Sequence, residues 1–566
     1  MARHDATLWN NCKIHFTIVD CLVIIIFLCL FASSSFNAGL DSPSFFRCIK
    51  WMCLFFMLRI ALSVYSKYIQ ILLLFIVSSL FVSELFVGLK QAISGTYSEI
   101  PGLICCGSFL NSGPYGGFMA VCLSLLLAYL LFSDKITNRY RWLILILFLP
   151  AVVILFLSLS RAAIISFLIS AFLLFLCLNE KMVRRYIFLL IPSFLLFSIL
   201  LYFFKKPSAD ARFYISKINM EIIAKNPFWG SGNNSFGRMY GESQKNHFIN
   251  GLLESESKES FNDDSSCTEI VRKLIIGDFS FQGSLEKERR SADVPDVAFN
   301  EYIQIAIEYG LLTSLVCVSL ILISIIRLFK SKSPWAYALC SLAFFSLFSY
   351  PLSYIYFKIL LLVSIASAAV CQKDSYNDKS IISYAVFIVS LSLLIYVCPK
   401  SNTDLAAKKK WQSEIKKYYW IGDYEKYVLE CKNLFDYLSE DQEFLYTYGN
   451  ALHKTGNLNN SDYVLTIGAL TSNHPRFETA LGWIKREIGE DAMAEEYFCE
   501  AYLKVPNRLY PLYSLARLYF ETDNYLLFEK IVEYIEKYPP KCENDDTRKM
   551  RKEIEKLTNN INDSSL

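Results

Sequence analysis

Charge is scarce in this chain of 566 residues: Asp, Glu, Lys and Arg make up 19% of it, whereas hydrophobic residues make up 54%. Soluble domains carry about 25% charged residues, so the composition excludes an ordinary soluble protein and favours a membrane protein. The net charge is only +3. Because nothing in that balance offers a strongly basic surface, we expect no nucleic-acid partner.

Cysteine motifs are also lacking, although the chain has 17 Cys. Most of them lie inside apolar runs, where Cys behaves as a small apolar residue. Seven could face an oxidising compartment: Cys105, Cys106, Cys267, Cys398, Cys431, Cys499 and Cys542. No CxxC and no Cys/His ligand spacing occurs among these seven, so the sequence predicts neither a disulfide framework nor a zinc site.

Long apolar runs alternate with short loops over the first 400 residues. Each run is about long enough to cross a bilayer as a helix. They lie near 15–34, 44–62, 68–88, 115–132, 142–160, 162–178, 187–204, 308–326, 335–350, 352–370 and 381–397. The first run resembles a signal peptide, but the ten further runs favour an anchor that is retained. The sequence therefore predicts a polytopic bundle of about eleven spans.

Lys and Arg gather in alternate loops of this bundle. They are Lys67, then Lys135, Arg139 and Arg141, then Lys181, Arg184 and Arg185, then Arg327, Lys330 and Lys332, and finally Lys373 and Lys379. Loops rich in Lys and Arg face the cytoplasm. With the N-terminus inside, an odd number of spans places the long segment 205–306 and the tail after Lys400 on the outer side.

The tail, 401–566, has the composition of a soluble helical domain. Prolines that would end helices recur at Pro475, Pro506 and Pro539, at intervals of 31 and 33 residues. This spacing is close to the tetratricopeptide period of about 34 residues. We expect three to four helix pairs whose concave face could dock a partner protein. The alternative is an irregular helical bundle without a partner.

Four polar or Gly-rich stretches on the predicted outer side could carry chemistry. The first, 107–117, reads GSFLNSGPYGG and leads into the fourth span. Its glycines and Pro114 permit a tight or re-entrant backbone, and a helix beginning there would present free N–H groups to an anion. We count Asn111 as a candidate substrate-binding residue, and a simple outer loop is the alternative.

The second stretch is Ser160-Arg161-Ala162-Ala163, on a side where positive charge is otherwise scarce. An Arg at the membrane boundary either snorkels to the headgroups or binds an anion. Snorkelling to the headgroups does not explain why this turn is so short, so we favour anion binding by Arg161.

The third stretch runs from Asp210 to Asn233 and ends in NPFWGSGN. Its apolar side chains, Ile215, Ile218, Ile222 and Ile223, predict an amphipathic helix on the membrane surface. Arg212 and Lys217 on this segment are candidate substrate-binding residues. For Arg212 the alternative is a contact with lipid headgroups.

The fourth stretch, 298–310, reads AFNEYIQIAIEYG. Glu301, Gln304 and Glu308 share one helix face, which would point acids into or beside the bundle. We count Glu301 as a candidate catalytic residue, and Asn300 and Gln304 as candidates for substrate binding. Stabilisation of the helix N-terminus is the alternative role of Glu301.

Four motifs, taken in their order along the chain, resemble those of the bacterial O-antigen ligase superfamily. They are SFLNSGPYGG, SRAA, an Arg followed by NPFWGSG, and FNEYIQIAIEYGLL. Its members include lipopolysaccharide O-antigen ligases, some glycan polymerases and protein O-oligosaccharyltransferases. The resemblance covers about residues 100–370, and some members also carry a tetratricopeptide tail.

The resemblance implies an all-α, GT-C-like transmembrane domain over 1–400, with a repeat domain over 401–566. It further implies a metal-independent enzyme without cofactors in the bacterial inner membrane, with the repeat domain in the periplasm. Such an enzyme transfers a glycan from an undecaprenyl-diphosphate carrier to an acceptor hydroxyl at the outer leaflet, among membrane lipids. The family's two diphosphate-binding arginines correspond to Arg161 and Arg212.

The last motif departs from the family pattern, Ala-His-Asn-Glu, because Phe299 stands where the family has its proposed general base. Phenylalanine cannot accept a proton. Glu301 is the nearest substitute, since apolar surroundings raise a carboxyl pKa, and His247 in the outer segment ranks second. A third possibility is that the diphosphate departs without a strong base once Arg161 and Arg212 neutralise its charge.

Three questions stay open in the sequence. Asp263-Asp264 could suggest a metal, but the surrounding 254–266 is typical of a flexible insert. A lipid-glycan transporter or an inactive scaffold is the competing function, although no internal duplication of the transporter kind is visible. The acceptor is lipid A core, a growing polymer or a protein hydroxyl.

Overall fold

The computed structural model describes ten segments of the chain: 16–37, 43–94, 105–109, 111–132, 138–178, 206–254, 266–371, 380–537, 541 and 543–564. Within these segments the regular structure is helical and no strand occurs. The all-α class is therefore confirmed. The predicted span 187–204, the insert around Asp263-Asp264 and Cys542 lie outside the described residues.

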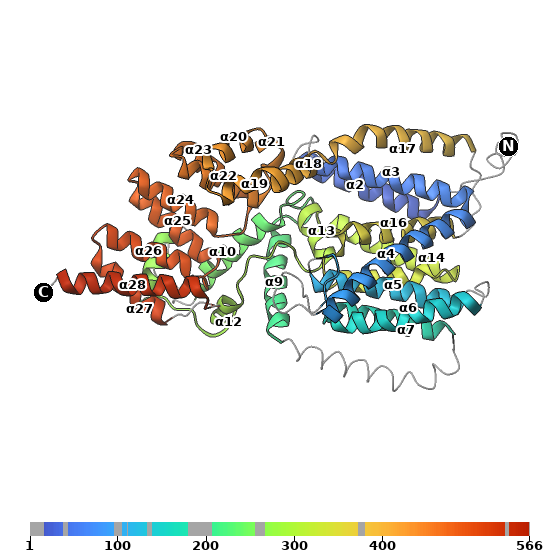
Figure 1. Cartoon of the computed structure of the whole chain (residues 1–566), viewed down its shortest axis with the longest axis horizontal. Coiled ribbons are helices and arrows are strands. Elements are labelled where there is room, and N and C mark those ends of the chain that lie inside the picture. Colours follow the sequence, from blue (N-terminus) through green and yellow to red (C-terminus); the bar gives the residue numbers. More distant parts are fainter. Residues whose placement is uncertain are drawn as a thin grey trace. The chain divides into compact units, whose positions relative to one another are not determined.

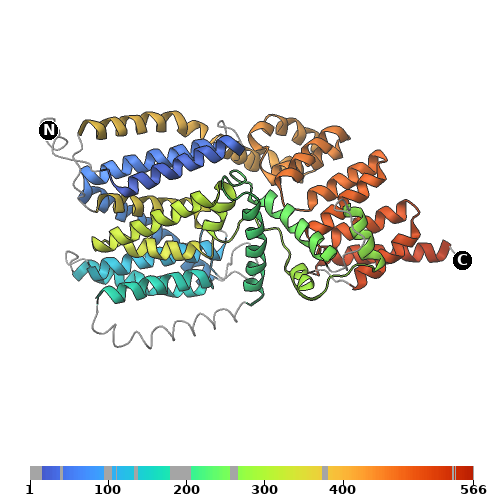
Figure 2. The ribbon, with the colours of Figure 1, turned by 180° about the vertical axis from the view of Figure 1, so that it is seen from behind.

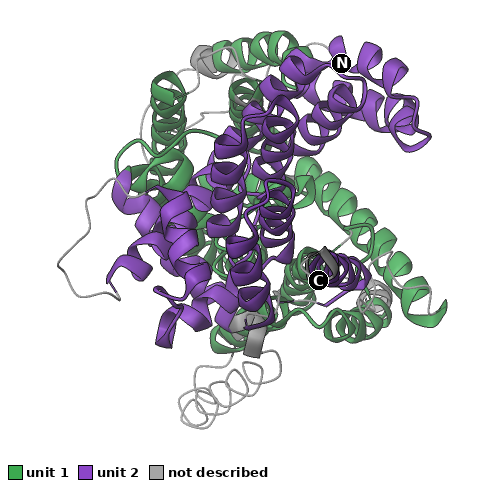
Figure 3. Ribbon diagram, turned by 90° about the vertical axis from the view of Figure 1, so that its left-hand side faces the viewer, with its two compact units in different colours: residues 1–209, 226–233, 297–401 green, residues 210–225, 234–296, 402–566 purple. Residues whose placement is uncertain are grey.

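The chain divides into two compact units, drawn in two colours in Figure 3. Unit 1 comprises 1–209, 226–233 and 297–401, and unit 2 comprises 210–225, 234–296 and 402–566. Segments of the long stretch 205–306 are thus grouped with the tail in unit 2.

Unit 1 is a helical bundle (Figure 1). Its helices are α2 (Ile18–Asn37), α3 (Pro43–Val64), α4 (Ser66–Ser94), α5 (Ser112–Phe132), α6 (Asn138–Leu157), α7 (Arg161–Leu178), α13 (Glu301–Tyr309), α14 (Leu311–Lys330), α15 (Trp335–Ser346), the 3₁₀ turn η1 (Pro351–Ser353), α16 (Ile355–Val370) and α17 (Ser380–Lys400). Ten of the eleven predicted spans coincide with helices of this set.

Several of these helices have the length and apolarity of membrane spans. Five helices of the described residues are long enough to cross: α2, α4, α5, α14 and the helix that begins with α17. Parts of α6, α7, α15 and α16 are apolar but shorter. Helix α3 carries three cations, of which Arg59 is buried and paired with Asp20 of α2 at 3.0 Å. Taken together, the chain is a multi-pass membrane protein.

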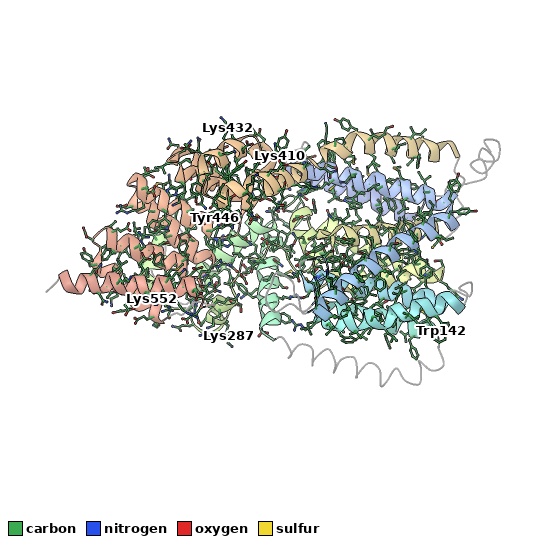
Figure 4. All side chains as sticks on the ribbon, in the orientation of Figure 1. Trp142, Lys287, Lys410, Lys432, Tyr446 and Lys552 are labelled. Carbon is green, nitrogen blue, oxygen red and sulfur yellow. The ribbon has the colours of Figure 1, made fainter. Side chains whose placement is uncertain are left out.

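Helix α5 lies at the centre of the unit 1 core and packs against α7 and α15. Small residues permit the close approach: a Cβ on Gly117 would lie 2.3 Å from the Phe345 ring, and one on Gly116 would lie 2.5 Å from Ser158 Oγ. Helices in membranes associate through such small residues because lipid supplies no hydrophobic drive between them. On the outside of α6, Trp142 is 68% exposed (Figure 4).

Unit 2 contains a stack of antiparallel helices (Figure 2). They are α22 (Gln442–Lys454), α23 (Leu458–Thr471), α24 (Arg476–Ile488), α25 (Asp491–Lys504), α26 (Leu509–Glu521), α27 (Tyr525–Lys537) and α28 (Asp545–Ser564), preceded by the short α18 (Thr403–Lys410), α19 (Lys416–Trp420), α20 (Tyr424–Lys432) and α21 (Phe435–Leu438). Helix pairs begin at Gln442, Arg476 and Leu509, 34 and 33 residues apart. This arrangement is compatible with a helical solenoid.

The same unit includes most of α9 (Lys206–Lys225) and all of α10 (Phe236–Glu254), α11 (Cys267–Ile276) and α12 (Gly283–Ser291). Helices α10 and α11 pack on α25. Asn473 donates to the Pro295 carbonyl at 2.6 Å, and Asn507 donates to that of Ala292 at 2.7 Å. These asparagines follow successive helix pairs, so the tail holds the backbone at Ala292 and Pro295 within unit 2.

Candidate functional site

Glu301 begins α13, outside the candidate membrane spans. The side chain of Asn300 caps this helix by accepting from the N–H groups of Tyr302 and Ile303 at 3.0 and 3.1 Å. Glu301 is 6% exposed, and its Oε1 accepts from the Leu352 N–H at 2.6 Å. Burial raises the pKa of Glu301 to about 7, and the Leu352 hydrogen bond opposes that rise.

A cavity of about 290 Å³ opens beside Glu301 within unit 1. Its walls are mostly apolar side chains of α2, α3, α14, α15 and α16, and its charged lining residues are Glu301 and Lys358. The carboxyl group is therefore buried against protein yet borders a space that another molecule could enter. Ligand sites commonly combine an apolar wall with a few such polar groups.

Tyr350 joins the first and fourth stretches. Its hydroxyl accepts from Asn111 Nδ2 at 2.8 Å, and its ring lies 5.6 Å from that of Phe299 in edge-to-face geometry. Phe299 itself adopts a positive φ of 54°, a conformation that non-glycine residues adopt uncommonly. Tyr350 was not among the predicted site residues, although its place before Pro351, at a break between two predicted spans, is a signal in the sequence.

Gln304 holds the loop that precedes α13. Its Oε1 accepts from the Ala298 N–H at 2.8 Å, and its Nε2 donates to Glu308 Oε1 at 2.7 Å. Asn111 and Asn300 likewise have partners within the protein, since Asn111 Oδ1 accepts from the Gly113 N–H at 2.9 Å. These three of the six predicted substrate-binding residues thus shape the backbone here.

Arg161 is the first residue of α7 and is partly buried. The turn before it contains Leu159 at a φ of 52°. Ser160 Oγ donates to the Gly113 carbonyl at 3.4 Å, so the second stretch lies against the first at the start of α5.

The glycine turn of the third stretch pairs with the end of α13. Ser231 N–H donates to the Ile307 carbonyl at 2.8 Å, and the Leu311 N–H donates to the Pro227 carbonyl at 2.7 Å. Gly310 has φ 89° and ψ 159°, a region that essentially only glycine adopts. A Cβ there would lie 1.9 Å from the Phe228 oxygen. Parts of all four stretches are therefore linked within unit 1.

Arg212, Lys217 and His247 belong to unit 2. Arg212 is partly buried on α9. The apolar side chains Ile215 and Ile218 of the same helix are 5% and 0% exposed. The expectation that this face lies on the membrane surface is therefore wrong for them, because they are buried in the protein.

His247 is held between two carboxylates. Its Nδ1 lies 3.0 Å from Glu221 Oε1, and its Nε2 lies 2.8 Å from Glu288 Oε2. Lys217 Nζ contacts the other oxygen of Glu288 at 2.7 Å. The hydrogen bond to Glu221 raises the pKa of His247, burial opposes it, and the bond to Glu288 adds to the rise. Sequence reasoning missed both acids, which lie 26 and 41 residues from His247.

One segment of the chain matches a known protein family. Residues 146–257 match the model of a family described as O-antigen ligase. The matched region contains Arg161, Arg212, Lys217 and His247 and ends before Glu301. None of the curated proteins compared with the chain matches it.

Proposed function

We propose that this chain transfers a glycan from undecaprenyl diphosphate to an acceptor hydroxyl. The match of residues 146–257 to the O-antigen ligase family supports this proposal. The transfer would take place at the outer face of the bacterial inner membrane, with unit 2 in the periplasm. Nucleotide sugars are not supplied outside the cytoplasm, so a lipid diphosphate brings both the glycan and the driving force.

In the proposed step, the acceptor oxygen attacks the anomeric carbon of the carrier-linked sugar. The bond from that carbon to the phosphate oxygen breaks, and the diphosphate leaves with the electron pair. Cationic side chains offset the growing negative charge of the diphosphate. The candidates for this role are Arg161 of unit 1 and, in unit 2, Arg212 and Lys217. Such charges act more strongly in a partly dry cleft than in water.

Glu301 takes the acceptor proton in this proposal. The supporting observation is that the Glu301 carboxyl group borders a cavity, and that burial raises its pKa to about 7. A general base works best when its pKa lies near the operating pH. Phe299 cannot serve, and Tyr350 beside it has its hydroxyl bonded to Asn111.

His247 is the weaker candidate for the base. Both of its ring nitrogens face carboxylates, and the raised pKa favours the protonated ring. A protonated imidazole has no lone pair with which to accept a proton. We therefore rank His247 below Glu301 and propose that it orders α9, which carries Arg212.

The acceptor can be lipid A core, a growing polymer or a protein hydroxyl. A deletion strain examined for lipopolysaccharide ladder, capsule length and periplasmic glycoproteins identifies it by the product that disappears. The strain is then complemented with Arg161→Ala, Arg212→Ala or, as a control, Lys287→Ala, an exposed cation of the same outer segment (Figure 4). We expect the control alone to restore the product. Restoration by Arg212→Ala would contradict the proposal.

A further inference from the structure

Unit 2 contains a second cavity, separate from the residues proposed for transfer. Its volume is about 470 Å³, and it lies between α10 and the helices α23, α24 and α25. Polar and aromatic side chains line much of it: Arg238, Glu242, Thr466, Glu478, Tyr497 and Lys504. This volume lies within the range of small-molecule sites, about 300–1,000 Å³.

Glu478 at this cavity has an unsatisfied oxygen. The residue is 2% exposed, and its Oε1 pairs with Lys504, which is 5% exposed. Its Oε2 is buried and has no hydrogen-bond partner. A buried polar group left unpaired costs about 1–3 kcal/mol, and more when it is charged. A ligand that donates a hydrogen bond to this oxygen would remove that cost.

The surrounding charges limit which ligand fits. Glu242 and Glu500 already share Lys245, at 3.0 and 2.8 Å, and Glu478 has Lys504. The acids and bases around the cavity thus offset one another, so neither a strong anion nor a strong cation gains from entering. Within the described residues no cluster of acids, His and Cys is suited to a metal ion. A neutral ligand with both donors and acceptors matches this lining.

We propose that this cavity binds a neutral, hydroxyl-rich carbohydrate. One sugar hydroxyl donates to Glu478 Oε2 and accepts from Lys504. Tyr497, which is partly buried, contacts the sugar, and the exposed Arg238 bonds a further hydroxyl at the mouth. The site adds glycan recognition to unit 2, and it does not depend on the transfer reaction or on Arg161.

Binding is tested with the full chain, purified in detergent, on an array of neutral oligosaccharides built from glucose, galactose, mannose and their N-acetyl derivatives. We expect wild type to bind at least one of them. Glu478→Gln should weaken that binding at least about tenfold, because an amide NH₂ can replace the acceptor oxygen. Glu496→Gln, an exposed acid on α25 outside the cavity, should bind as wild type does.

Thr466→Phe gives a second variant that leaves the buried Glu478–Lys504 pair intact, since a phenyl ring would fill the cavity from its partly buried wall. It should also abolish binding, with an unchanged unfolding temperature. Absence of binding to every oligosaccharide would overturn the proposal and leave water as the occupant. Full binding by both Glu478→Gln and Thr466→Phe would also overturn the proposal. Because the array carries no polyprenyl diphosphate, Arg161→Ala should bind normally, which separates this test from that of transfer.

Discussion

The perturbation that tests the proposed chemistry most directly is Glu301→Gln. It keeps the size of the side chain and removes the ionisable group. With a pKa of about 7, only about a tenth of Glu301 would be ionised at about pH 6, and nearly all at about pH 8. We expect the wild-type transfer rate to rise about tenfold between these values, and the Gln variant to lose both the rate and this dependence.

The same group affects stability, with a defined sign. The pKa in the folded state lies above the ordinary value of 4.5, so the fold favours the neutral carboxyl. Below about pH 4.5 the group is neutral in both states. Between about pH 4.5 and pH 7 the unfolded chain loses this proton while the folded state keeps it, so the fold loses about 3 kcal/mol of stability, and the loss is complete above about pH 7. Glu301→Gln avoids that cost. Its stability relative to wild type should therefore be greater at about pH 8 than at about pH 5.

Two measurements in detergent check these statements: thermal unfolding at both pH values, and transfer from a synthetic polyprenyl-diphosphate glycan across the pH range. Glu308→Gln serves as the matched variant on α13, because the Glu308 charge raises the pKa of Glu301. Its rate profile should keep its shape while its midpoint moves to lower pH. A flat wild-type profile, or wild-type turnover by Glu301→Gln, would refute a role for Glu301 as the base.

Three further predictions concern the remaining elements of the site. Arg161→Ala and Arg212→Ala should each lower transfer by about 10²–10³-fold with normal membrane insertion, as measured by glycan product and by membrane fractionation. His247→Ala should lower turnover less than Glu301→Gln does. Because the pKa of His247 is raised in the fold, its stabilising effect is complete below about pH 6.5 and is lost as pH rises through the folded value. The loss of stability relative to wild type should therefore be larger at about pH 6 than at about pH 9. Gly310→Ala should destabilise the protein by more than the about 1–3 kcal/mol of backbone strain alone. Gly277 has φ 101° and open space around it, so Gly277→Ala should cost only that strain. Equal losses of stability in thermal unfolding would count against the close approach at Gly310.

The helices and the membrane character follow from local sequence. Long apolar runs such as those of α4, α5 and α14 form helices, because in lipid every backbone N–H and C=O group must be satisfied within the segment. The motifs around Arg161 and Arg212 resemble the same family whose model matches residues 146–257. These signals are local in the chain, which is why they can be recognised without coordinates.

Contacts between distant residues required the tertiary structure. Tyr350 meets Asn111 across 239 positions, and Asn473 reaches the Pro295 carbonyl across 178; no pattern along the chain encodes either pairing. His247 illustrates the same limit, since its pKa depends on Glu221 and Glu288, which only folding brings to its two nitrogens. Composition and periodicity determined which segments are helical and apolar. Packing alone decided which polar atoms are partnered, which are buried, and which face a cavity.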